Sequence, residues 1–288
     1  MCCDHALDAQ VPGGVYLCQV SEKVSCGACC GLYNVADTSR PAMEKMLRAR
    51  TVRFAQVPRT AAAIDAFARE TTAIEPQERP FPQFHHCPFT GLIGKDLSRV
   101  GCLLHPMATG NNGVDFRGLS YYGGLACHSY FCPATHQVAP RHKKILRALI
   151  DDWHLYGLVV TESDLLMALF QEIERRLGRK IHLEAFYQYP EAVQPLMDLL
   201  RLKIDWPHRP PEADTPCHYF FFDLVHERPT VAYARLGVAV SRFEVILREL
   251  VSLFDSAADL RRAEERIEAG IEAVVGVFRE GTEGQERD

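Results

Sequence analysis

Apolar residues recur every three or four positions along most of the chain beyond residue 140, which is the pattern of amphipathic helices. The pattern predicts helices over residues 145–153, 165–177, 191–203, 230–254 and 257–278. Thr161 and Asp164 have the spacing of a capping box before the second of these helices, and Gly178 is placed to end it. We therefore expect this half of the chain to be helical, with its apolar stripes in the core.

The helical pattern is weaker before residue 140. Two short helices are predicted, over residues 41–50 and 60–70. Repeated prolines between 75 and 88 exclude a regular helix or a central strand there, and glycines and asparagines between 110 and 124 predict turns with positive φ. Such a segment buries little apolar surface by itself. Bound metal is a candidate for what stabilises it, since ligation can contribute on the order of 10 kcal/mol to folding.

This change of pattern predicts a boundary near residue 140. We expect a mainly α protein in which an irregular, cysteine-rich, metal-binding region, residues 1–140, precedes a helical region, residues 141–288. The chain has 288 residues, 47% of them hydrophobic, which is enough for one large domain or two modest ones.

Charge and hydropathy narrow the classes of partner. The net charge is -5 and the pI is about 6.2, so there is no general basic field to hold nucleic acid. The basic run at 141–144 is predicted to be the solvated start of a helix. No apolar run approaches the roughly 20 residues that span a bilayer, and the opening residues lack a signal-peptide pattern. We expect a cytoplasmic protein without a nucleic-acid or membrane partner; a protein partner or protein substrate is open and unidentified.

In a reducing compartment clustered cysteines indicate metal or redox chemistry rather than structural disulfides. Of the 11 cysteines, Cys2 and Cys3 lie at a terminus expected to be mobile, and Cys217 stands alone and is expected to be an ordinary buried thiol. The remaining cysteines are the predicted metal ligands: Cys18, Cys26, Cys29, Cys30, Cys87, Cys102, Cys127 and Cys132. Their number fits two four-thiolate centres as well as one centre with four cysteines that do not ligate.

The adjacent cysteines at 29 and 30 bear on the identity of the metal. Cys26-x-x-Cys29 is a turn from which two thiolates can reach one centre. Successive side chains diverge by about 100° on a helix and about 180° on a strand, so Cys29 and Cys30 fit a single compact zinc site with difficulty. An iron–sulfur cluster of the 4Fe-4S kind, or two separate centres, accepts divergent thiolates more easily. Iron–sulfur is therefore favoured, with zinc as the alternative, and catalytic or disulfide-bonded cysteines come third.

Three cysteine elements occur in a recognisable order. They are Cys26-Gly27-Ala28-Cys29-Cys30, Cys87-Pro88-Phe89 and Cys102-Leu103-Leu104-His105. This order resembles that of the CxxCxxCC family of zinc- or iron-chelating proteins, which implies a chelated metal with Cys127 and Cys132 as the later cysteines. The family's first cysteine falls at Lys23 here, where Cys18 is a candidate replacement, and Pro106 stands without the usual preceding arginine. A methylase of flagellin lysines carries a similar motif, so the resemblance also allows a protein-modifying enzyme.

Several histidines lie beside these cysteines and could ligate zinc or replace a thiolate, although such histidines more often hydrogen-bond to a ligand or carbonyl. They are His85, His86, His105, His128 and His136. The segment 111–124 is interpreted as a turn-rich connector with Tyr121 and Tyr122 packed beneath it; the alternative is a loop over the metal with Arg117 facing an anion or the thiolates. The usual radical-SAM cysteine spacing and the Gly-rich phosphate loops are absent from the sequence. Whether the protein is an enzyme is therefore undetermined.

Overall fold

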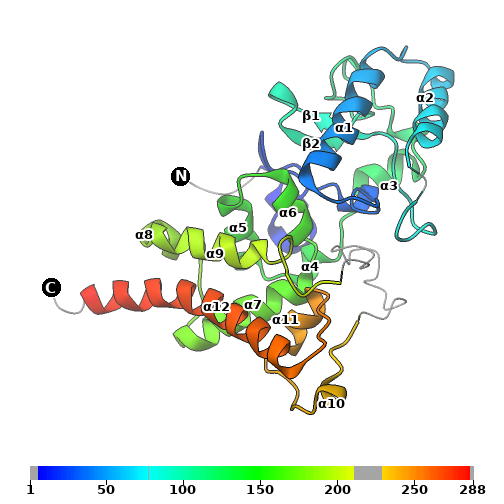
Figure 1. Ribbon diagram of the computed structural model, residues 1–288. Helices are drawn as coiled ribbons and strands as arrows, with labels where there is room; N and C mark the ends of the chain where they lie inside the picture. The colour runs from blue at the N-terminus through cyan, green and yellow to red at the C-terminus, as the bar shows by residue number, and fades with distance from the viewer. Residues whose placement is uncertain (1–5, 77, 211–228, 286–288) are drawn as a thin grey trace.

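The computed structural model describes residues 6–76, 78–210 and 229–285. Helix accounts for 55% and strand for 4% of the structure, so the protein is mainly α, as the sequence predicts. Figure 1 shows the helices of the second half of the chain beneath a smaller group of elements from the first half. None of the described helices combines the length and the apolar character that crossing a bilayer requires.

The first half contains a two-stranded hairpin that the sequence did not predict. Strands β1 (Thr90–Ile93) and β2 (Arg99–Cys102) pair antiparallel, with Thr90 opposite Cys102. Helix α1 (Arg40–Ala55) packs on β1, where the Leu92 amide donates to Thr51 Oγ1 over 2.9 Å. Gly91 permits this approach, because a Cβ atom there would lie 2.6 Å from the same hydroxyl.

Helix α2 (Ala61–Ile74) follows α1, and α3 (Gly123–Ser129) and α4 (Ala134–Gln137) come after the hairpin. Both predicted helices of this half are confirmed and are longer than expected. Positive φ at Gly110, Asn112, Gly113 and Gly123 confirms the predicted turns at these positions. Proline-rich residues 78–88 contain no helix or strand, in agreement with the sequence.

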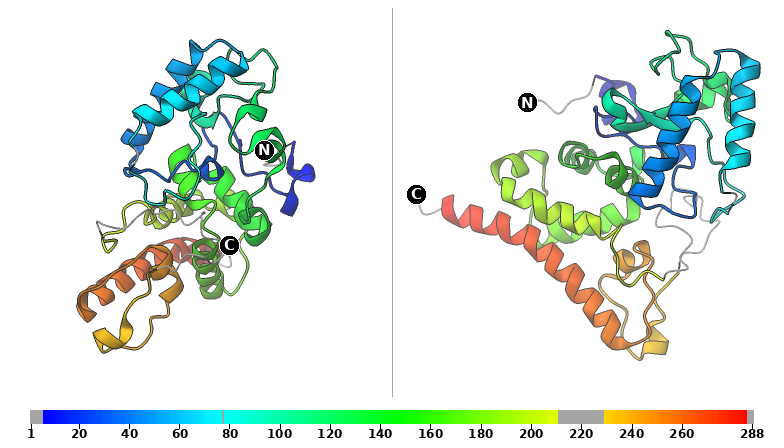
Figure 2. Two further views of the ribbon diagram at one scale, coloured as in Figure 1. Left: turned by 90° about the vertical axis from the view of Figure 1, so that its right-hand side faces the viewer. Right: turned by 45° about the horizontal axis from the view of Figure 1, so that its top comes forward.

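The second half is built from helices that pack around one large apolar core. In chain order they are α5 (Pro140–Leu149), α6 (Trp153–Val159), α7 (Ser163–Leu177), α8 (Leu183–Gln188), α9 (Val193–Arg201), α10 (Tyr233–Leu236), α11 (Glu244–Glu249) and α12 (Ala257–Gln285). The long helix α12 packs along both α7 and α9 (Figure 2). Its predicted apolar stripe is confirmed, because Ile267, Ile271 and Val274 are fully buried.

Three predictions for this half are wrong in detail. The stripe over 145–153 belongs to two helices, since Asp152 caps a new helix by accepting from the amides of His154 and Leu155. The expected helix over 230–254 is two short helices, separated after the left-handed Gly237. The solvated basic run is also wrong, because His142 and Lys143 are buried and Lys143 Nζ donates to the Thr135 carbonyl over 2.7 Å.

The capping box at Thr161 is wrong as well. Helix α7 begins at Ser163, and Thr161 Oγ1 is buried without a hydrogen-bond partner among the described residues. Glu162 instead forms an ion pair of 2.9 Å with the fully buried Lys203. This tertiary contact fixes the start of the helix in place of the local cap. Gly178 ends α7 in the left-handed conformation, as predicted.

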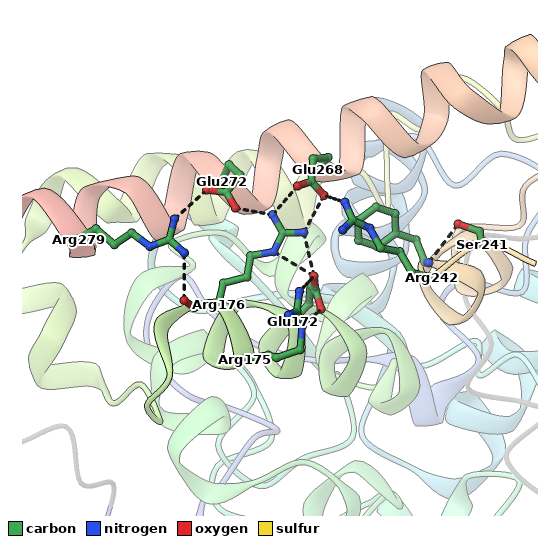
Figure 3. A network of polar contacts seen from close by, with 9 residues as sticks. Glu172, Arg175, Arg176, Ser241, Arg242, Glu268, Glu272 and Arg279 are labelled. Carbon is green, nitrogen blue, oxygen red and sulfur yellow. Dashed lines mark hydrogen bonds and ion pairs between the residues drawn. The ribbon is translucent and has the colours of Figure 1, made fainter.

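Charged side chains fasten α7 to α12 at the edge of the core. Arg176 of α7 donates to Glu172 on its own helix and to Glu268 and Glu272 of α12, over 2.6 to 2.8 Å (Figure 3). The Arg176 side chain is only 5% exposed, so it is shielded more than a surface ion pair would be. Arg242 and Arg279 contact Glu268 and Glu272 from the outside.

Apolar packing crosses residue 140. Val15, Leu17 and Val24 belong to the same core cluster as the helices from α5 to α12. A second cluster joins Ala28, Leu32, Tyr33 and Met43 to Trp153 and Leu158. The first half of the chain therefore packs directly on the second, and the boundary near residue 140 stays a prediction.

Candidate functional site

All eight cysteines predicted as metal ligands are free thiols within the described residues. Cys87 is buried, Cys29 and Cys127 are exposed, and the others are partly buried. Cys2, Cys3 and Cys217 lie outside the described residues. The alternative in which these eight thiols pair as disulfides finds no support in the structure.

Cys30, Cys87 and Cys102, here called the hairpin thiols, come together from three separate segments. Cys30 and Cys102 pack against an aromatic cluster that contains Cys87, Phe54, Phe67 and Phe89. The Cys87 amide donates to the Cys30 carbonyl over 2.9 Å. The hairpin register brings Cys102 opposite Thr90, three residues after Cys87. The unpredicted hairpin is thus the element that brings the third cysteine to the other two.

Each hairpin thiol lies in the electrostatic field of the others. Burial, and after it the neighbouring Cys30, raise the pKa of Cys87 to about 12. Burial likewise raises the pKa of Cys102, with contributions from Cys30, Cys87 and Cys127. The pKa of Cys30 is raised by a hydrogen bond with Cys29 and by burial. These thiols are therefore neutral unless a cation joins them, because several thiolates at one buried place repel one another.

Two exposed cysteines lie at the rim of this group. Cys29 is in the short 3-10 turn Ala28–Cys30, and Cys127 is in α3 with its Sγ 3.1 Å from Ser120 Oγ. The turn ends at Gly31 with a φ of 72°, and a Cβ there would lie 1.9 Å from the His85 carbonyl oxygen. Only glycine fits this position. Gly31 therefore allows the backbone at His85, just before Cys87, to pack directly on the turn that carries Cys30.

Cys18, Cys26 and Cys132 form a second group, here called the core thiols. The Cys26 amide donates to the Cys18 carbonyl over 2.8 Å, and Cys26 and Cys132 pack against the large helical core. Burial raises the pKa of Cys18 to about 12, with Cys132 and then Cys30 as further causes. Burial of Tyr156 raises its pKa too, and Cys26, Cys18 and Cys132 add to the effect. All three thiols are therefore near enough to one buried phenol to disfavour its ionised form.

The cysteines from 26 to 30 accordingly divide between the two groups. Cys26 packs on the helical core and its Sγ accepts from the Ala28 amide over 3.5 Å, whereas Cys30 packs on the aromatic cluster. The predicted divergence of the adjacent Cys29 and Cys30 is not observed, because their side chains share a hydrogen bond. That Cys26 and Cys29 reach one centre from a single turn stays a prediction.

Arg50 of α1 occupies the interior beside the hairpin thiols. The sequence analysis missed this residue, although a lone arginine on the apolar face of a short helix is a signal that could have drawn attention to it. It is paired with Glu75 over 2.6 Å, and its charge lowers the pKa of Cys30 and Cys87 as a minor cause.

The histidines next to the cysteines differ in their environments. His86 is buried and both its ring nitrogens are engaged, by Arg50 and by the Gly31 carbonyl. His85 stacks on Tyr121 with ring centroids 4.4 Å apart; burial and then Arg79 lower its pKa to about 4. Nδ1 of His105 accepts from the Met107 amide over 3.1 Å. His128 and His136 are exposed. His86 therefore has no ring nitrogen left for a metal, whereas the other four histidines could still act as ligands.

The segment 111–124 is rich in turns, as predicted, with positive φ at Asn112, Gly113 and Gly123. Tyr121 and Tyr122 are 76% and 52% exposed, so the prediction that they pack beneath the loop is wrong. Arg117 donates to both carboxylate oxygens of Asp115, over 2.6 to 3.1 Å, which engages most of its donors. Its Nη1 also contacts the Cys127 carbonyl at 3.5 Å. The loop therefore rests beside Cys127 without presenting a free guanidinium.

Within residues 6–76, 78–210 and 229–285, no three side chains of His, Cys, Asp or Glu are placed so that together they could hold a metal ion. The segments that carry the cysteines pack together, but their side chains are not arranged around one common metal position. The donors are nevertheless of one chemical kind, soft and partly buried thiols, which suits zinc or an iron–sulfur cluster. Comparison of the chain with family models, with curated proteins and with solved structures gave no match.

Proposed function

We propose that this protein binds metal through the hairpin thiols and carries an iron–sulfur cluster there, with Cys127 or Cys29 as the fourth ligand. One observation carries the proposal: Cys30, Cys87 and Cys102 are free thiols from three segments that meet on one small aromatic cluster. The Cys87 amide bonded to the Cys30 carbonyl supports a common site for the first two. Such a cluster, when bound, supplies electron transfer or an iron atom that can bind a substrate.

The core thiols are the basis for a second centre. Cys18, Cys26 and Cys132 all contribute to the raised pKa of Tyr156, and Cys26 and Cys132 pack against the large helical core and not against the aromatic cluster of the hairpin thiols. In a protein with two centres, the hairpin thiols would bind one metal centre and the core thiols the other. One centre at the hairpin thiols, with the core thiols as ordinary buried cysteines, is the simpler form of the same proposal.

The resemblance to the CxxCxxCC family is part of this proposal, as is the description of residues 1–140 as the metal-binding region. Two of its three cysteine elements, at Cys30 and Cys87, lie side by side through a backbone hydrogen bond. The third, at Cys102, lies across the hairpin from Thr90. An order of cysteines in the sequence that corresponds to neighbours in space supports a shared site.

Serine substitutions in protein produced without oxygen test the proposal. Cys30→Ser, Cys87→Ser and Cys102→Ser should each lose most of the iron and sulfide and the brown colour, because a serine oxygen replaces a thiolate poorly on iron. Cys217→Ser is the matched control and should retain both. Colourless wild-type protein without iron or sulfide would reject the iron–sulfur centre, and stoichiometric zinc in its place would establish the alternative.

A zinc-stapled interaction module is the second candidate, and the surface near the site favours it. Exposed apolar side chains are frequent in the sequence between residues 107 and 130: Met107, Val114, Leu119, Tyr121, Tyr122, Leu125 and Tyr130. Exposed apolar side chains in such numbers are typical of segments that bind other proteins. In this case the metal holds the irregular segments in place, and Leu125→Ser should abolish partner binding while the bound zinc stays stoichiometric. Loss of zinc in this variant would instead show that the residue supports the fold.

A further inference from the structure

Arg50 contacts the turn that carries Cys87. Its side chain is 1% exposed, and its Nη1 donates to the carbonyl oxygens of Cys87 and Thr90, over 3.0 and 3.2 Å. These carbonyls begin and end the segment that leads from Cys87 into strand β1. One guanidinium nitrogen thus fixes the backbone on both sides of the turn.

The same guanidinium reaches the turn that carries Cys30 through one other side chain. Arg50 Nη2 contacts Nε2 of His86, and this nitrogen must accept because a guanidinium has only donors. The His86 proton is then on Nδ1, which donates to the Gly31 carbonyl over 2.8 Å. Gly31 directly follows Cys30, so hydrogen bonds connect Arg50 to both thiol-bearing turns.

We propose that Arg50 is the positioning residue that sets the distance between the thiols of Cys30 and Cys87, so that both can bind one metal centre. This inference rests on the proposed function for its metal. Arg50 acts through the Cys87 carbonyl and through His86 rather than on either sulfur directly. It differs from the cysteines in that it organises the site without binding to the centre.

The role requires an arginine rather than any cation. Four residues around Arg50 (Glu75, His86, Cys87 and Thr90) accept hydrogen bonds from its planar fork of N–H donors, whereas a lysine offers one rotating ammonium group at the end of a flexible stem. Glu75 balances the charge, since it accepts from Arg50 Nε over 2.6 Å. Arg50→Lys keeps the charge and removes the geometry. Partners that orient metal ligands typically account for about 10- to 100-fold in metal affinity.

Anaerobic titration of the reduced, metal-free full-length chain with Co²⁺ tests the inference. Affinity is measured by competition with a chelator, and thiolate ligation by the thiolate-to-cobalt absorption band. Arg50→Lys should weaken cobalt binding about 10- to 100-fold and reduce the thiolate band. Arg176→Lys is the matched control: its side chain is 5% exposed and bonds to Glu172, Glu268 and Glu272 of α7 and α12, so the substitution should leave affinity and spectrum unchanged. Equal cobalt affinity and equal spectra for Arg50→Lys and wild type would overturn the inference.

Two further arms cover the remaining outcomes. If Arg50→Lys fails to fold by circular dichroism, His86→Leu decides, because it cuts only the branch to Gly31; unchanged cobalt binding in that variant would overturn the role. If the wild type binds no cobalt, metal binding itself fails. The reagent phenylarsine oxide then measures thiol spacing directly, since its arsenic bridges two neighbouring thiols and releases water. Slower bridging of Cys30 to Cys87 in Arg50→Lys than in Arg176→Lys would support the positioning role, and equal rates would overturn it.

Discussion

The helical core and the hairpin-thiol region are held together by different means. Around α7, α9 and α12 the side chains interlock through one large apolar cluster, and the Arg176 ion pairs fasten its edge. Around Cys30, Cys87 and Cys102 the apolar cluster is small, and a buried Arg50 bonds to backbone carbonyls between them. Apolar burial therefore maintains the first region, whereas the second depends on directional bonds and, in our proposal, on metal.

This difference predicts which region responds to removal of metal, and this is the largest effect we expect. Chelation under anaerobic reducing conditions should increase hydrogen exchange of the amides at Cys87, Leu92 and Val100 by about 100-fold or more, because ligation contributes on the order of 10 kcal/mol where it occurs. Amides of α7 and α12 should keep their protection. If chelation changed hydrogen exchange equally in both regions, or left it unchanged in the hairpin, the proposed difference between the two regions would be wrong.

A cavity in the helical core should lower the stability of the fold without affecting the metal site. Ile271 of α12 is fully buried, so Ile271→Ala should lower the free energy of unfolding by about 2 to 5 kcal/mol. Metal content should remain that of the wild type, since the residue packs among helices far along the chain from the cysteines. Denaturant unfolding followed by metal analysis checks both expectations. A parallel loss of metal in folded Ile271→Ala would show that the two regions are one cooperative unit.

Acid sensitivity should be a smaller effect and should arise in the helical region. A hydrogen bond from Arg175, with help from Arg176, lowers the pKa of Glu172 to about 2. A carboxyl whose pKa falls on folding stabilises the protein above its unfolded pKa near 4.5, and this contribution is lost as the pH falls toward 2. The variant Glu172→Gln should therefore be less stable than wild type at pH 7 and should lose less stability between pH 5 and pH 2. If the free energy of unfolding depended on pH equally in Glu172→Gln and wild type, Glu172 would not contribute to the acid sensitivity.

The helices were the part of the fold that the sequence predicted best. Where a helix prediction was wrong, the physical cause can be identified. Long stripes such as that of α12 predict burial because the 3.6-residue period repeats many times. Gly237 ends a predicted helix early, because a left-handed residue stops what the stripe would continue. At Thr161 a tertiary ion pair between Glu162 and Lys203, which no local rule contains, replaces the predicted cap. Four-residue strands such as β1 are too short to display an alternating pattern.

For the site, the sequence predicts eight cysteine ligands but does not predict how these cysteines are grouped in space. The meeting of Cys30 with Cys87 follows the order of the cysteine elements. The predicted divergence of Cys29 and Cys30 is not observed, because their side chains share a hydrogen bond. That Cys26 belongs with Cys18 and Cys132 depends on packing against α5 to α12, which spacing does not encode. Arg50 likewise acquires its role only from carbonyls that lie 37 and 40 positions away in the sequence.

X-ray absorption at the iron and zinc edges of anaerobically purified protein tests the central claim most directly. The account predicts iron with sulfur as its neighbours and a second iron atom at short distance, with both signals lost in Cys87→Ser and retained in Cys217→Ser. Protein that holds neither iron nor zinc after anaerobic purification, with all hairpin thiols open to modification, would contradict it.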